Sequence, residues 1–146
     1  MNVVVDWEAA GAWRDHVQAF AMVESSGDPD IKPSDDRQAR GLLGMHPAQF
    51  RTYYGKVEQF AASVKDTWET SDIKTCAAFL EIEVPRLSKK FGINVGLDLA
   101  VQAWNKGVEA VEGGVRNLDY LDKWTRFFQG IRSGKLVILI PKGGWV

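Results

Sequence analysis

The chain has 146 residues, of which 45% are hydrophobic and 25% are charged, and its formal net charge is -1. This length fits one domain with a sizeable core, and this composition excludes a wholly disordered chain. A charge so close to zero gives no overall attraction to phosphates or anionic lipid headgroups, so we expect no nucleic-acid partner.

The first residues lack the basic start and long apolar stretch of a secretory signal, and no later run is long enough to span a bilayer. We therefore expect synthesis in the cytoplasm and no transmembrane segment. The sequence contains no internal repeat, low-complexity tract or linker, which predicts a single domain over residues 1–146.

The first predicted element is a helix over residues 7–25. Apolar side chains recur every three or four positions from Trp7 to Phe20, and Glu24 lies on the same stripe. Residues 25–27, Ser-Ser-Gly, are typical of helix ends. Glu24 should therefore lie in the last helical turn.

The next segment reads as irregular. Residues 27–40 combine prolines with many turn-forming residues, which predicts a surface loop or a small β ribbon. Pro47 and Gly55 then mark the start and end of a brief helix.

Helical spacing returns in the second half of the chain. One stripe runs from Ile73 to Phe91, with Asp72 as its N-cap and Gly92 as its stop. Pro85 lies within this stripe, where it either kinks the helix or divides it.

Two shorter helices and an apolar tail complete the chain. Leu97 begins a stripe that ends at Gly107, and a last stripe runs from Leu118 to Ile131. The tail, residues 136–140, is either a buried strand or an apolar patch that needs a partner. The pattern as a whole predicts a mainly α domain with a polar loop or small β ribbon.

Glu24 is the first candidate for chemistry. A carboxyl in partly apolar surroundings tends to keep its proton, because burial disfavours the charged form, and it can then act as an acid. The alternative is a plain surface glutamate, but the C-terminal end of a helix is an electrostatically poor place for an anion.

Four sequence blocks resemble the soluble lytic transglycosylase family. Residues 24–29, Glu-Ser-Ser-Gly-Asp-Pro, are similar to the family's Glu-Ser-Ser-Gly-Asn-Pro, and residues 39–47, Ala-Arg-Gly-Leu-Leu-Gly-Met-His-Pro, to its Ala-x-Gly-Leu-Met-Gln-Leu-x-Pro. Residues 103–107, Ala-Trp-Asn-Lys-Gly, and 117–121, Asn-Leu-Asp-Tyr-Leu, resemble its Ala-Tyr-Asn-Ala-Gly and Thr-x-x-Tyr-Val segments. The blocks occur in the family's order, and the likeness covers roughly residues 13–128.

The resemblance implies a lysozyme-like fold that cleaves peptidoglycan between N-acetylmuramic acid and N-acetylglucosamine, with Glu24 as catalytic acid and base. It also implies a substrate site that is made of Ser25, Leu43, Gly44, Met45, Trp104, Asn105 and Tyr120. An amide can hold a sugar N-acetyl group, and a tyrosine hydroxyl can donate to the glutamate or to a sugar oxygen.

Two of these positions depart from the family. Gly44 stands where the family carries a substrate-contacting glutamine, which removes one polar contact, and Trp104 replaces a tyrosine. Trp104 is either a sugar platform or a core residue, and its place on an apolar helical stripe favours the core.

The reaction depends on how many carboxyl groups take part. A lytic transglycosylase needs only Glu24, whereas a hydrolase needs a second carboxylate about 5 Å away or, when it activates water, about 6.5 to 9.5 Å away. The loop after Glu24 offers Asp28, Asp30, Asp35 and Asp36, in a region where goose-type lysozymes, which resemble this family in fold, place catalytic acids. Asp35 or Asp36 is our choice, and the alternative is an acidic loop that is simply solvated. A chitinase-like glycosidase or a non-catalytic cell-wall-binding module would also fit these sequence blocks, since a fold does not by itself decide a substrate.

The sequence offers no metal or cofactor motif. Its two histidines and lone cysteine lack zinc-type spacing, and there is no glycine-rich phosphate loop, so we expect neither metal nor cofactor. The expected partner is the glycan strand of peptidoglycan, and the oligomeric state stays open. A cell-wall enzyme without a signal sequence needs another route to its substrate, which favours a phage endolysin or another delivery system.

Overall fold

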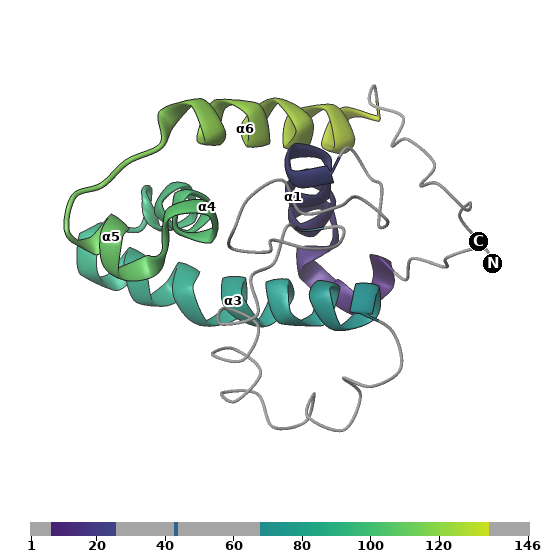
Figure 1. The fold of residues 1–146 in the computed structure, drawn as a ribbon, viewed down its shortest axis with the longest axis horizontal. Helices are drawn as coiled ribbons and strands as arrows, with labels where there is room; N and C mark the ends of the chain where they lie inside the picture. The colour runs from purple at the N-terminus through teal and green to yellow at the C-terminus, as the bar shows by residue number, and fades with distance from the viewer. Residues whose placement is uncertain (1–6, 26–42, 44–67, 135–146) are drawn as a thin grey trace, which may run out of the picture.

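The computed structural model describes residues 7–25, 43 and 68–134. Over these residues the fold is mainly α, as predicted: one 3-10 helix and five α-helices, with no strand (Figure 1). None of these helices is both long and apolar enough to cross a membrane.

Three predicted segments lie outside the described residues. They are the loop or small β ribbon at 27–40, the brief helix between Pro47 and Gly55, and the apolar tail at 136–140. These expectations stay predictions.

The first predicted helix is divided in two. A 3-10 helix, η1 (Trp7–Trp13), precedes the α-helix α1 (Arg14–Ser25), so the prediction of one continuous helix is wrong. The backbone bends at Gly11, whose φ of 58° and ψ of -129° are incompatible with a regular helix and favour glycine. Glu24 lies in the last turn of α1, as predicted.

The long helix α3 (Trp68–Phe91) begins earlier than predicted, so Asp72 lies inside it rather than at its N-cap. Pro85 is exposed and is accommodated within this one helix, which it does not divide. The predicted stop is confirmed: Gly92 has a φ of 121°, and its N–H donates to the Ser88 carbonyl at 2.8 Å.

Three helices follow: α4 (Gly96–Lys106), α5 (Val108–Glu112) and α6 (Leu118–Ser133). The predictions of α4, with its stop at Gly107, and of α6 are confirmed. Helix α5 was not predicted, because five residues are too few to show a helical period. Leu118, the first residue of the predicted apolar stripe, is 67% exposed.

Aromatic side chains join the helices at the centre of the core. The Phe20 ring on α1 lies 5.6 Å from Trp104 of α4 and 5.5 Å from Trp124 of α6, centre to centre. Phe79 of α3 meets Trp104 edge to face at 5.1 Å. Figure 1 shows α1 between α6 and α3, and most of the α1 side chains from Val17 to Met22 are buried in this core.

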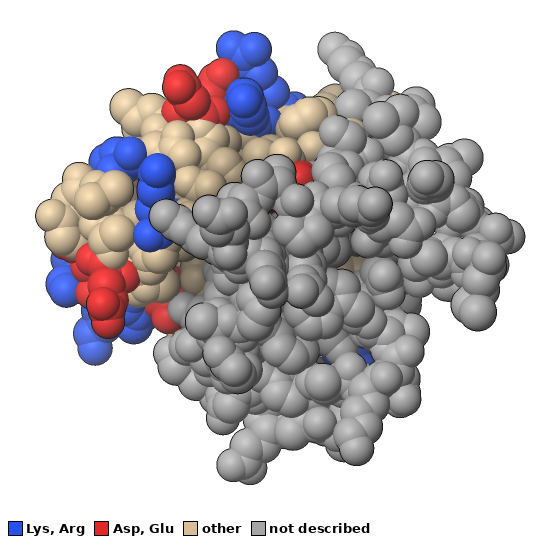
Figure 2. Space-filling model, viewed as in Figure 1, with Lys and Arg blue, Asp and Glu red and all other residues tan. Residues whose placement is uncertain are grey.

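The described surface carries charges of both signs. On the face in Figure 2, acidic and basic side chains lie beside one another over the described helices.

Candidate functional site

Glu24 and Tyr120, which are 96 positions apart in the sequence, meet where α1 packs against α6. The Tyr120 hydroxyl donates a hydrogen bond to Glu24 Oε1 at 2.8 Å. Glu24 comes from the last turn of α1 and is partly buried, whereas Tyr120 comes from the first turn of α6 and is only 7% exposed. The packing of these two helices therefore brings together two residues that were proposed from separate sequence blocks.

The chemistry of Tyr120 is set by its surroundings. Burial raises the pKa of Tyr120 well above its ordinary value of 10, and the adjacent Glu24 raises this pKa further through its charge and through the hydrogen bond. The phenol therefore keeps its proton at neutral pH. It serves as a fixed donor that holds the Glu24 carboxyl in one orientation.

Trp104 and Leu43 lie in the core. Trp104 is 5% exposed, and its indole N–H donates to the Leu43 carbonyl at 3.1 Å, while the Leu43 side chain is fully buried. A sugar platform requires an exposed ring face, so the structure does not place Trp104 as one. Trp104 instead fixes the backbone at Leu43, which directly precedes two other predicted site residues.

Asn105 is exposed in the last turn of α4, close to the start of α6. Its Oδ1 accepts a hydrogen bond from Asn117 Nδ2 at 2.7 Å. Asn117 is the N-cap of α6, three residues before Tyr120, and its own Oδ1 accepts from the Tyr120 backbone N–H. Asn105 is thus linked to the Glu24–Tyr120 pair through one intervening residue.

The contributions of Asn117 and Gln102 were not predicted from the sequence. Asn117 stands directly before a predicted helix, and an asparagine at that position is a recognisable N-cap. Gln102 is only 2% exposed and accepts a hydrogen bond from the Asn117 backbone N–H at 2.8 Å. No local sequence pattern predicts this role for Gln102, because a polar residue within an apolar helix is compatible with many roles.

Several predicted site residues are not placed. Gly44, Met45 and the candidate second carboxylates Asp35 and Asp36 lie outside the described residues, and Ser25 is described only as the last residue of α1. Their proposed contacts therefore stay predictions.

The described part of the chain offers no candidate metal site. There, no group of three or more histidine, cysteine, aspartate or glutamate residues is arranged to hold a metal ion. Cys76 is buried on α3.

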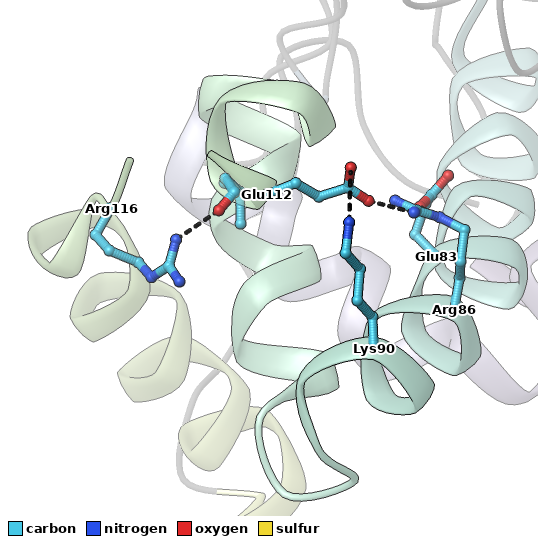
Figure 3. Close-up of polar contacts among 6 residues, drawn as sticks. Glu83, Arg86, Lys90, Glu112 and Arg116 are labelled. Atoms are coloured by element: carbon cyan, nitrogen blue, oxygen red, sulfur yellow. Dashed lines mark hydrogen bonds and ion pairs between the residues drawn. The ribbon is translucent and has the colours of Figure 1, made fainter. Parts of the chain in front are cut away.

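A second polar cluster joins α3 to α5 (Figure 3). Arg86 donates through Nε to the buried Glu83 at 2.6 Å and also contacts Glu112. Lys90 Nζ lies 3.7 Å from Glu112. The hydrogen bond from Arg86 lowers the pKa of Glu112, so this carboxylate stays ionised. Because its charges are matched within the cluster, we interpret it as an attachment of α5 to α3 rather than as a reaction centre.

Comparison of the chain with protein-family models, with curated proteins and with solved structures gives no match. Support for a function therefore comes from the four sequence blocks and from the contacts at Glu24 and Tyr120.

Proposed function

We propose that this protein cleaves the glycan strands of peptidoglycan at the β-1,4 bond between N-acetylmuramic acid and N-acetylglucosamine, as a lytic transglycosylase. The observation that supports this most is the 2.8 Å hydrogen bond from Tyr120 to Glu24. The two residues belong to separate blocks that resemble the family, and helical periodicity alone does not require them to meet.

In the proposed reaction Glu24 acts first as an acid and then as a base. Its protonated carboxyl donates to the glycosidic oxygen as the bond from the muramic acid C1 to that oxygen breaks. The C6 hydroxyl of the same sugar then attacks C1 and gives its proton to the Glu24 carboxylate, which closes a 1,6-anhydro ring. No water is consumed, and the carboxyl returns to its starting state.

Tyr120 assists by orienting the carboxyl. Its hydroxyl remains protonated at neutral pH and bonds one oxygen of Glu24. Fixing the carboxyl in advance reduces the reorganisation needed when the proton is transferred. We expect this orienting role for Tyr120 because its phenol stays neutral while the adjacent Glu24 carboxyl loses and regains its proton.

Asn105 is suited to contact the sugar. It is exposed and linked through Asn117 to the turn that carries Tyr120. Because its carbonyl oxygen is engaged by Asn117, Asn105 mainly offers its N–H groups to a ligand. The acetamido carbonyl of an N-acetyl sugar is a matching acceptor.

Mass spectrometry of the products tests this proposal. Purified peptidoglycan is digested with the wild-type protein, with Glu24→Gln and with Glu109→Gln, which makes the same change at an exposed glutamate on α5. We expect 1,6-anhydro-muramic acid ends from the wild type and Glu109→Gln, and none from Glu24→Gln, which keeps the shape of the side chain but has no transferable proton.

Different products would indicate different functions. Reducing ends, heavier by one water, would establish a hydrolase and direct attention to Asp35 and Asp36. Cleavage of chitin oligomers but not of peptidoglycan would indicate a chitinase-like enzyme. Binding to cell walls without any cleavage would indicate a binding module. Full activity in Glu24→Gln would refute the assignment of Glu24.

A further inference from the structure

Three side-chain amides, those of Gln102, Asn105 and Asn117, join α4 to the start of α6. We call these three residues the amide clamp. The backbone N–H of Asn117 donates to Gln102 Oε1 at 2.8 Å, and the side-chain Nδ2 of Asn117 donates to Asn105 Oδ1 at 2.7 Å. Two residues of α4 therefore hold the N-cap residue of α6 by its backbone and by its side chain.

The orientation of each amide in the clamp follows from backbone groups. The Tyr120 N–H can only donate, so the Asn117 atom that it meets at 3.1 Å must be the oxygen. The other end of the Asn117 amide is then a donor, which requires the oxygen of Asn105 to face it. The backbone N–H of Asn117 likewise requires the oxygen of Gln102, whose Nε2 donates to the Asp98 carbonyl at 3.2 Å.

Burial makes the clamp a firm attachment. Gln102 is 2% exposed, so water competes little for its hydrogen bonds. Its amide is also bonded to its own helix one turn earlier, at Asp98. The position of Asn117 is therefore set by the body of α4, which packs on α3, and not only by the loop that precedes α6.

Asn117 lies one helical turn before Tyr120, the residue that contacts the proposed acid Glu24. Asn117 Oδ1 holds the backbone of Tyr120, and the side chain of the same Tyr120 holds Glu24. We propose that Asn117 is a positioning residue, which acts through Tyr120 to fix the carboxyl of Glu24. The predicted effect of Asn117 on catalysis rests on the proposed function, whereas its predicted effect on the position of Tyr120 does not.

A double-mutant cycle tests this coupling. Asn117→Ala removes both the acceptor for the Tyr120 N–H and the donor to Asn105; we expect the first loss to lower kcat about 10-fold and the second to affect KM. In a Tyr120→Phe background the same change should lower kcat by less than about 2-fold, because the contact through which it acts is already gone. Asn117→Ser, which returns an N-cap acceptor, should recover most of the lost kcat.

A matched control separates positioning from stability. Gly134, at the other end of α6, has a φ of 73°, so Gly134→Ala strains the C-terminal end of the same helix. It should lower the melting temperature by a few degrees, as Asn117→Ala does, but leave kcat unchanged at temperatures well below unfolding.

Nuclear magnetic resonance gives a readout that does not depend on activity. With tyrosines labelled at Cζ with carbon-13, the chain shows three signals, and the signal that Tyr120→Phe removes belongs to Tyr120. At pH 7 this signal reports the hydrogen bond of the phenol. We expect it to move in Asn117→Ala and Glu24→Gln and to stay in place in Gly134→Ala.

The two proposals can fail separately. If the Tyr120 signal moves in Asn117→Ala but the wild-type protein cleaves no glycan, Asn117 positions Tyr120 and the proposed function is wrong. If the wild type cleaves peptidoglycan through Glu24 but Asn117→Ala leaves both kcat and the Tyr120 signal unchanged, the positioning role is overturned. An equal loss of kcat in both backgrounds of the cycle would also overturn it.

Discussion

His16 should make the stability of this protein sensitive to mild acid. It lies on α1, 9% exposed, with its ring centre 4.6 Å from that of Phe128 and 4.9 Å from that of Trp13. Its Nδ1 has no hydrogen-bond partner among the described residues. Burial and the positive charge of Arg132 lower the pKa of His16 to about 4, although Asp15 acts in the opposite direction.

The sign and size of the effect follow from this lowered pKa. Between pH 6.5 and about 4 the unfolded chain binds a proton at His16 and the folded chain does not, so the folded state loses stability as the pH falls. Well above pH 6.5 His16 is neutral in both the folded and the unfolded chain, so the folded state keeps its full stability. The difference between the two pKa values corresponds to about 3 kcal/mol at most, or a melting temperature lower by about 10 °C.

Urea unfolding of the wild type and of His16→Leu, followed by circular dichroism from pH 7 to pH 4, measures this contribution. The variant does not titrate at position 16, so its comparison with the wild type isolates the contribution of His16. The wild type should lose up to about 3 kcal/mol more than the variant over this range. A stability difference that stays constant with pH would refute the reasoning.

Three further substitutions have defined outcomes. Tyr120→Phe should lower kcat on peptidoglycan by about 10- to 100-fold through the lost hydrogen bond to a carboxyl, while the circular dichroism spectrum is unchanged; an unaffected kcat would contradict the assigned role. Trp104→Phe should cost about 1–3 kcal/mol in urea unfolding, because the buried Leu43 carbonyl loses its donor, and a cost near zero would contradict this. Gly96→Ala should cost about 1–3 kcal/mol or more in the same assay, because a Cβ there would lie 2.8 Å from both Ser88 Cβ and the Val84 carbonyl oxygen, and unchanged stability would contradict this close packing of α4 on α3.

The helices that the sequence located correctly are those with a long local period and a glycine stop. Spacing of three and four residues places apolar side chains on one face whatever the rest of the chain does, so α4 and α6 were predicted close to their observed bounds. The bend at Gly11 was not predicted. Trp7 and Ala10, on the N-terminal side of the bend, are buried, so the apolar pattern continues across it. The same pattern could not reveal that an exposed Pro85 would be tolerated within α3.

At the candidate site, too, some features follow from the local sequence and others do not. The order of residues along the chain was enough to show which residue types are available and where Glu24 lies on its helix, since both depend only on local order. The contact between Glu24 and Tyr120, the burial of Trp104 and the attachment of Asn117 to Gln102 were decided by the tertiary structure. Each depends on how α1, α4 and α6 pack against one another, and the period of a single helix carries no information about the side chains of its neighbours.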